Sequence, residues 1–338
     1  MTYNFDEIID RSPKSNTFSF KWQGYEGRFP GFNIDTGNVI SMWVADMDFR
    51  APQEVISALS KRVEHGIYGY SAEDANDVFR KAAVGWFARR YNWKCQTEWI
   101  LFTPGVVPAI NNAIQEFTEE GDGVIIQPPV YYPFAAGIVN NHRTIVNNQL
   151  KEVDGRYEID FENLEMHARN PQNKMIILCN PHNPVGRVWT RNEMYRVCKI
   201  CYDNNVLIFG DEIHADLIMS GHKLLPIGSL EEFHDKMILA HAPSKTFNLA
   251  GLCASLVTIP SPDLRTKMAT RLFANRMPGG NTFGPIAGAA AYEHGDEYAD
   301  AVVAYIEANV NYAIAYLKKN LPAVKIIKPE GTYLIWFD

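Results

Sequence analysis

Short apolar runs alternate with amphipathic segments through the middle of the chain. Five runs of four or five residues are almost wholly apolar, which is typical of strands that are buried on both faces of a sheet. These runs are 99–102, 124–127, 175–179, 206–209 and 237–240. Because helical patterns lie between several of them, the sequence predicts an α/β fold with a mostly parallel sheet and helices on both of its faces.

Two of the helical patterns are well defined. The segment 107–117 repeats apolar residues at helical spacing. Thr190 followed by Glu193 forms a capping box, which predicts the start of a second helix. This helix carries Cys198 and Cys201 on its apolar stripe. Since no second Cys or His pair accompanies this CxxC spacing, we expect both thiols to pack in the core and predict no metal site.

The two ends of the chain have a different pattern from its middle. Residues 1–44 are rich in turn formers, namely Gly24, Gly27, Pro30, Gly31 and Gly37. From residue 287 onward a helix rich in Ala and Tyr precedes two apolar strands at 325–328 and 333–337. We therefore expect a large domain over 45–286 and a smaller α+β domain built from 1–44 and 287–338. Because the chain stops directly after an apolar strand, we expect the small domain to be incomplete in this sequence.

Composition narrows the class of protein. The 338 residues include 32 Lys and Arg against 39 Asp and Glu, a formal net charge of −7 that gives no reason to expect binding to nucleic acid or to an anionic membrane. No apolar run approaches the roughly 18 residues of a membrane span, and the N-terminus lacks the apolar region of a secretory signal. Five cysteines are an odd number that favours reduced thiols. We expect a cytoplasmic enzyme.

Candidate chemical groups follow five of the apolar runs. In an open parallel sheet, ligands bind beyond the carboxyl ends of the strands. The residues found there are Gly105 at a helix start, Tyr131, Asn183, Asp211 and Lys245. A lysine can bond to an aldehyde, a carboxylate can pair with a pyridine nitrogen, and a helix start can bind phosphate. An aromatic ring can stack on the pyridine, and an amide can bind its hydroxyl. Together these groups are what pyridoxal phosphate requires.

Each of these residues also has a purely structural interpretation. Asp211 could cap a turn, Lys245 could be an exposed loop residue, and turns like the one at Gly105 precede many helices. Their occurrence on successive strand ends favours the joint interpretation. Dinucleotide and P-loop motifs are absent, and no defensible HExxH or Ser–His–Asp pattern occurs.

Seven segments together resemble a known family. They resemble the MalY/PatB-type cystathionine β-lyases of the class I/II aminotransferase superfamily, which are fold-type I pyridoxal phosphate enzymes. The segments are VADMDF (44–49), HGIYGYS (65–71), TPGVV (103–107), PPVYYPF (128–134), NPHNPVG (180–186), DEIH (211–214) and SKTFNLAGL (244–252). The resemblance implies a large domain with a mainly parallel seven-stranded sheet and a smaller α+β domain.

The resemblance also implies roles for individual residues. Lys245 would bond to the cofactor aldehyde, and Asp211 would pair with the pyridine nitrogen. Asn183 would bind the ring hydroxyl, and Tyr131 would stack on the ring. The phosphate would be held by the backbone at Gly105, Val106 and Val107 and by Ser244. Lys245 and Tyr131 would act in catalysis.

A third catalytic residue, Tyr70, would come from the neighbouring subunit, so the active protein would be a homodimer with shared sites. The chain departs from many aminotransferases at two positions. His214 would lie beside the cofactor at the place where many aminotransferases have a tyrosine, and Cys253 stands where many have a phosphate-binding arginine. Both changes are typical of the β-lyase branch. The family's carboxylate-binding arginine falls beyond residue 338.

The expected activity is therefore a carbon–sulfur β-lyase. It would cleave cystathionine, cystine or other cysteine S-conjugates to pyruvate, ammonia and a thiol, with Lys245 as the general base on the Cα proton. Two alternatives remain open at this point. One is an aminotransferase that uses the same cofactor, and the other is a cofactor-binding regulatory protein that acts through surface contacts.

Overall fold

The computed structural model describes residues 3–12, 15–23, 40–72, 74–277 and 280–337. The turns expected at Gly24, Gly27, Pro30, Gly31 and Gly37 lie outside these residues. No helix within the described ranges is long and apolar enough to cross a membrane.

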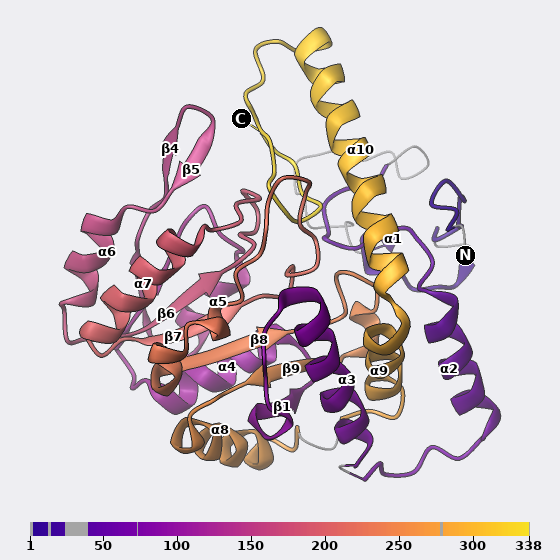
Figure 1. Ribbon diagram of the computed structural model, residues 1–338, viewed down its shortest axis with the longest axis horizontal. Coiled ribbons are helices and arrows are strands. Elements are labelled where there is room, and N and C mark those ends of the chain that lie inside the picture. Colours follow the sequence, from indigo (N-terminus) through magenta and orange to yellow (C-terminus); the bar gives the residue numbers. More distant parts are fainter. Residues whose placement is uncertain (1–2, 13–14, 24–39, 73, 278–279, 338) are drawn as a thin grey trace.

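A seven-stranded sheet occupies the centre of the molecule (Figure 1), in the order β1-β9-β8-β7-β6-β2-β3. Its strands are β1 (Ile100–Thr103), β2 (Gly123–Ile126), β3 (Thr144–Asn147), β6 (Asn173–Cys179), β7 (Leu207–Asp211), β8 (Met237–His241) and β9 (Ser255–Thr258). β9 runs antiparallel to both of its neighbours, and the other four pairings are parallel. The predicted mostly parallel sheet is confirmed, and each of the five predicted runs forms a strand.

Helices cover both faces of the sheet, because successive strand residues point to opposite sides. In β6, Ile176 and Leu178 join one hydrophobic core, whereas Met175 and Ile177 join the other. The first core is completed by α2 (Gln53–Glu64), α3 (Asp74–Tyr91), α6 (Phe161–Ala168), α7 (Arg191–Asp203) and α9 (Gly284–His294). The second is completed by α4 (Val106–Phe117), α5 (Pro133–Asn140) and α8 (Pro262–Ala274). The strands are therefore apolar on both faces, as the sequence pattern predicts.

Helix α7 confirms the predicted capping box. The Thr190 hydroxyl accepts from the Glu193 backbone, and the Glu193 side chain accepts from the Thr190 backbone. Cys198 and Cys201 are fully buried in the first core, so they pack as expected. Across the described ranges, no three His, Cys, Asp or Glu side chains are grouped so that they could hold a metal ion.

The C-terminal part begins with α9, which packs against α2 and α3. It continues through α10 (Asp296–Asn320), which rises away from the sheet (Figure 1). The predicted strands at 325–328 and 333–337 appear in shorter form as the antiparallel pair β10 (Ile326–Ile327) and β11 (Trp336–Phe337). The expected domain boundary at 286–287 falls inside α9, and the division into domains stays a prediction.

The remaining elements are small. A hairpin of β4 (Lys151–Val153) and β5 (Arg156–Glu158) projects beside α6, and α1 (Phe20–Gln23) lies in the N-terminal arm (Figure 1). Short 3₁₀ turns are η2 (Thr97–Trp99), η3 (Ile227–Ser229), η4 (Glu231–Lys236) and η5 (Ala250–Leu252).

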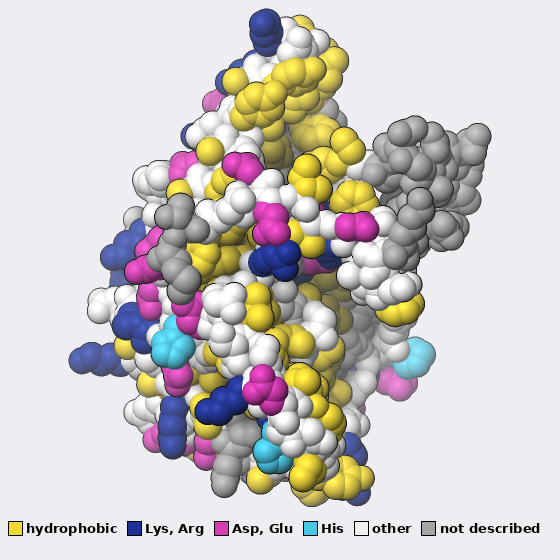
Figure 2. Space-filling model, turned by 90° about the vertical axis from the view of Figure 1, so that its right-hand side faces the viewer, with side chains coloured by type: hydrophobic (Ala, Val, Ile, Leu, Met, Phe, Trp, Pro, Cys, Tyr) yellow, Lys and Arg dark blue, Asp and Glu magenta, His cyan; other side chains and the backbone are white. Residues whose placement is uncertain are grey.

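The outer end of α10 exposes Tyr312 and Tyr316, where hydrophobic side chains gather at the top of Figure 2.

Candidate active site

A cavity of about 190 Å³ lies at the carboxyl ends of the parallel strands. Turns after β1, β2, β6, β7 and β8 all contribute to its wall. Every residue predicted to bind the cofactor lines it: Gly105, Val106, Val107, Tyr131, Asn183, Asp211, His214, Ser244 and Lys245. The structure therefore brings together residues that lie up to 140 positions apart in the sequence (245 − 105).

Asp211 is the last residue of β7, and its side chain is buried. One carboxylate oxygen accepts a hydrogen bond from the Ile213 backbone N–H at 3.0 Å. Burial raises the pKa of Asp211 to about 6, although the Ile213 N–H and the charge of Lys245 favour its ionised form. A buried carboxylate with so few partners has the capacity to pair with a cationic group in the cavity.

Lys245 lies in the turn after β8, the strand next to β7. Its Nζ donates a hydrogen bond to the Ala45 carbonyl at 2.8 Å. Burial lowers the pKa of this amine, while the nearby carboxylates of Asp46 and Asp211 act in the opposite direction. A lysine with a lowered pKa supplies more of the neutral, nucleophilic amine at neutral pH.

The start of α4 forms another part of the wall. Gly105 is the N-cap residue, and the first helical hydrogen bond runs from the Ala109 N–H to the Gly105 carbonyl at 3.1 Å. The N–H groups of Val106 and Val107 precede that bond and are free of helical partners, as at any helix start. Such groups attract an anion. The Ser244 residue lines the same cavity.

Tyr131 and Asn183 are linked through the backbone. The Tyr131 N–H donates to the Asn183 carbonyl at 3.1 Å, which ties the turn after β2 to the turn after β6. Burial raises the pKa of the Tyr131 hydroxyl to about 12, so this group stays protonated at neutral pH. The pair places one aromatic ring and one amide at the same cavity.

His214 is buried, and neither of its ring nitrogens has a hydrogen-bond partner in the described ranges. Burial and the charge of Lys245 lower its pKa to about 3, so the imidazole is neutral. Its ring and that of Tyr333 are arranged in a T shape, with the ring centroids 5.7 Å apart. Cys253 also lines the cavity and is exposed. Neither residue therefore supplies a positive charge to the helix start at neutral pH.

Tyr70 is the one predicted site residue that the chain does not bring to the cavity. It lies in the loop between α2 and α3, and its side chain is fully exposed. An alternative interpretation of the sequence is that the tyrosines of this loop are buried within their own subunit. Among the described residues, none covers the Tyr70 ring.

Other contributors to the site were missed by sequence reasoning. The segment 44–49 reaches the cavity through the Ala45 carbonyl, and Asp46 acts on the amine of Lys245. Arg11 of the N-terminal arm binds Asp46 at 2.6 Å and thereby fixes this segment. Tyr333 approaches from the C-terminal strands. Two carboxylates within the VADMDF segment were a signal for Asp46, whereas Tyr333 gave none, because only tertiary packing places it here.

The groups around the cavity fit pyridoxal phosphate. A buried carboxylate and a lysine with lowered pKa occupy one wall, and free N–H groups at a helix start occupy another. These match the cofactor's pyridine nitrogen, aldehyde and phosphate in chemical type. The unpartnered imidazole of His214 leaves further polar capacity in the same space.

Comparisons with known proteins agree with this geometry. The family model for aminotransferase class I and II matches residues 38–338. Cystathionine β-lyase PatB from Bacillus subtilis (strain 168) is 44% identical over 336 residues, which cover 99% of this chain and 84% of that protein.

Two solved structures are similar along the whole chain. A pyridoxal-phosphate-bound putative aminotransferase from Clostridium difficile 630 has a TM-score of 0.94 at 41% identity and covers 100% of this chain and 84% of its own. Cystalysin from Treponema denticola, whose structure contains pyridoxal 5'-phosphate, has a TM-score of 0.93 at 38% identity with the same coverage. The chain belongs to the aminotransferase class I and II family and has the fold-type I architecture of pyridoxal-phosphate-dependent enzymes.

Proposed function

We propose that this protein is a pyridoxal-phosphate-dependent carbon–sulfur β-lyase that acts on cystathionine or other cysteine S-conjugates. One observation carries the proposal: Lys245 and Asp211 lie on adjacent strand ends and line one cavity, in a chain 44% identical to a cystathionine β-lyase. The reaction takes one water and yields pyruvate, ammonia and the thiol of the departing group.

The bound cofactor supplies an aldehyde that takes up amino groups and a ring that accepts electrons from the substrate carbon. Lys245 would hold the aldehyde, and its free amine would remove the proton from the substrate Cα. The lowered pKa of Lys245 suits this role, because a neutral amine can accept that proton. The hydrogen bond from Nζ to the Ala45 carbonyl orients the amine at the cavity wall.

The other cavity residues bind and orient the cofactor. Asp211 pairs with the pyridine nitrogen and keeps it protonated, since an opposite charge favours the protonated form. Asn183 binds the ring hydroxyl, and the protonated Tyr131 stacks on the ring. The phosphate binds to the backbone at the start of α4 and to Ser244. His214 lies beside the ring as a neutral group.

The protein acts as a homodimer, and Tyr70 completes the site of the neighbouring subunit. Tyr70 and Ile67 are largely exposed on the same Gly-punctuated loop. Leaving two large apolar side chains in water has a cost, which contact with a second copy removes. The cytoplasm is the compartment that fits the five free thiols, four of them buried.

Product analysis tests the activity. The cofactor-loaded protein should release pyruvate, ammonia and a thiol from cystathionine without any added keto acid. A requirement for a keto acid, with the amino group transferred to it, would instead identify an aminotransferase. Cofactor binding with no turnover of any amino acid would favour the regulatory protein. Either of the last two outcomes overturns the lyase proposal.

A further inference from the structure

A buried carboxylate outside the cavity joins the Lys245 turn to helix α3. Asp216 lies five residues after Asp211 and is buried. One of its oxygens accepts from Trp86 Nε1 at 2.8 Å and from the Tyr91 hydroxyl. The other accepts from the Thr246 hydroxyl at 2.7 Å. Three donors from two distant segments therefore converge on one side chain.

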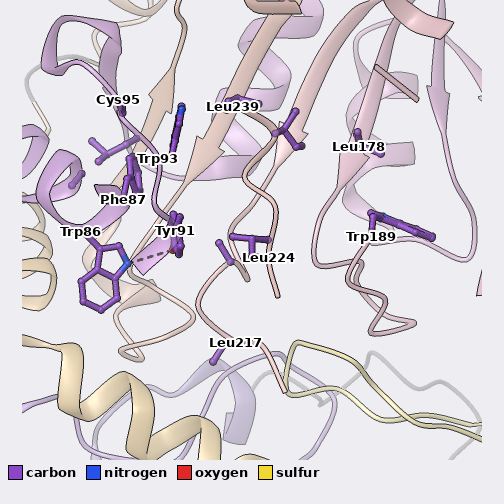
Figure 3. Packing of buried hydrophobic residues seen from close by; sticks show 14 of the residues in the cluster. Trp86, Phe87, Tyr91, Trp93, Cys95, Leu178, Trp189, Leu217, Leu224 and Leu239 are labelled. Atoms are coloured by element: carbon purple, nitrogen blue, oxygen red, sulfur yellow. Dashed lines mark hydrogen bonds between the residues drawn. The ribbon is translucent and has the colours of Figure 1, made fainter. Parts of the chain in front are cut away.

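Both donors on α3 lie near its C-terminal end. Figure 3 shows Trp86 and Tyr91 close together, joined by a hydrogen bond of 3.3 Å between Trp86 Nε1 and the Tyr91 hydroxyl. Trp86 is also held by its stacking against Tyr292 of α9, with ring centroids 5.3 Å apart. The α3 side of Asp216 is thus held by two hydrogen bonds and by the packing of Trp86.

The third donor belongs to the turn that carries the lysine. Thr246 directly follows Lys245 and is fully buried, and it does not line the cavity. The turn itself is closed by backbone hydrogen bonds from Phe247 to Pro243 at 2.9 Å and from Leu249 to Ser244 at 3.0 Å. Its one side-chain tether to Asp216 is therefore next to the reactive amine, on the side away from the cavity.

The hydrogen bond between Thr246 and Asp216 has a defined donor and acceptor. The Thr246 hydroxyl donates to the Asp216 side chain, so the hydroxyl has one orientation. Burying a carboxyl group is costly compared with packing an apolar residue of similar size, so stability alone gives weak reason for an aspartate here. A fixed orientation beside the lysine is what the carboxylate adds.

We propose that Asp216 is a positioning residue that holds the Lys245 turn at a set place relative to α3 through Thr246. This inference rests on the proposed role of Lys245 as the lysine that binds the cofactor. A displacement of a reacting group by about 1 Å can lower a rate by about 100-fold, so such a tether has a measurable consequence.

Titratable groups lie near both Lys245 and Asp216. Asp46, Asp211 and His214 face Lys245. Tyr91, Tyr292 and Arg90 lie near Asp216. Burial acts to lower the pKa of Arg90, but the carboxylates of Asp300, Asp216 and Asp296 raise it above its usual value. None of these groups is altered by a substitution at Thr246, which makes that position the clean test.

The test compares Thr246→Val, which removes the tether, with Thr246→Ser, which keeps the hydroxyl. Tyr91→Phe is the matched control, because it removes one hydrogen bond from the same carboxylate while Trp86 Nε1 still joins that carboxylate to α3. We expect Thr246→Val to lower kcat by about tenfold or more with KM within about twofold. Thr246→Ser should restore kcat, and Tyr91→Phe should lower Tm while kcat stays near that of the wild type.

A second readout needs no cofactor. The acetylation rate of Lys245 is followed against pH in the cofactor-free protein by peptide mass spectrometry. Burial lowers the pKa of the Lys245 amine. A loosened turn in Thr246→Val should therefore move the midpoint of the acetylation rate to higher pH. The midpoint in Tyr91→Phe should stay where it is in the wild type. If Thr246→Val fails to fold, Asp216→Asn replaces it. Its amide can donate to the Thr246 oxygen, so we expect a smaller shift in the same direction.

The outcomes separate the two proposals. Borohydride reduction of the loaded wild-type protein should label Lys245, and label on another lysine overturns the proposed function. If Lys245 is labelled but Thr246→Val and Tyr91→Phe give equal kcat and equal midpoints, Asp216 is only a structural residue. That result overturns the present inference and leaves the lyase proposal intact.

Discussion

The Lys245 turn and the Tyr70 loop differ sharply in how the chain supports them. The lysine turn is buried beneath the sheet ends and is fixed by Ala45, by Asp216 and by its own backbone hydrogen bonds. In the Tyr70 loop, a Cβ added to Gly69 would have no atom within 4 Å, and Tyr70 itself is fully exposed. One segment is completed within the chain, whereas the other presents its side chains outward.

This difference indicates which part of the site a single subunit can build. The residues proposed to bind the cofactor line one cavity within a single chain, because they follow strands of one sheet. The aromatic loop between α2 and α3 has no such support. We infer that the cofactor-binding half is intrinsic to the subunit, while the half that holds Tyr70 depends on a second copy.

The largest expected effect comes from removing the lysine. Lys245→Ala should abolish turnover and prevent the borohydride label, because no other amine lines the described cavity. The protein should still fold, since the backbone bonds of the turn are unaffected. Retained turnover, or a label at a different lysine, would contradict the role proposed for Lys245.

Asp211→Asn should have the next largest effect. Without the carboxylate, the pyridine nitrogen loses its proton more easily, and a neutral ring is a poorer electron acceptor. We expect turnover to fall on the order of 100-fold or more, which corresponds to roughly 3 kcal/mol or more in the barrier. Steady-state kinetics measure this effect, and the borohydride label at Lys245 serves as the control that cofactor is still bound. Near-native turnover would remove Asp211 from the mechanism.

Subunit mixing tests whether the exposed Tyr70 acts in the site of a second subunit. Lys245→Ala and Tyr70→Ala should each be inactive or nearly so when alone. In a mixed dimer one site carries both lesions and the other carries neither, so random exchange should restore about a quarter of wild-type activity. Exchange is verified with differently tagged chains. No recovery despite verified exchange would place both residues in the same subunit's site.

The smallest expected effect concerns stability. Burial raises the pKa of Asp211 to about 6, above its value in the unfolded chain. The contribution of Asp211 to the free energy of unfolding is therefore most favourable below the unfolded pKa. This contribution is lost as the pH rises through about 6. In the cofactor-free protein, Asp211→Asn should be more stable than the wild type above pH 6, by roughly 2 to 3 kcal/mol.

Urea unfolding of both proteins between pH 4 and pH 8 measures that difference. The two curves should converge toward the acidic end, where the wild-type carboxyl is protonated. A constant difference across the range would show that the charge at Asp211 is not the cause. The same substitution is thus expected to cost activity and to increase stability.

Strand-forming runs were the part of the fold that sequence reasoning could predict. β6 and β7 are apolar on both faces, so their pattern is visible without any partner. β3 was missed because it lies at the sheet edge with half-exposed side chains, and β9 because Ser255 and Thr258 interrupt its apolar pattern. In both cases strand pairing, which is a long-range property, determines the structure.

The candidate site follows the same rule. Asp211 and Lys245 come two and five residues after apolar runs, so the sequence itself places them near the sheet end. Asp46 lies near Lys245, and Tyr333 packs against His214, but neither residue comes directly after a strand of the central sheet. Their positions depend on how the N-terminal arm and the C-terminal strands pack on the large sheet, and local pattern carries no such information.

The pairing of β1 with β9 has a consequence for the order of folding. Thr103 Oγ1 and Ser255 Oγ lie 2.7 Å apart, although 152 residues separate them in the chain. β1 has its sheet partner in β9, so it joins the sheet only after that long loop closes. During synthesis, the turn after β1, which is the proposed phosphate site, leaves the ribosome well before the strand that fixes its position. A nascent chain that ends between Lys245 and β9 has the lysine but lacks the strand that pairs with β1. We therefore expect the cavity to form, and the cofactor to bind, only late in the synthesis of the chain.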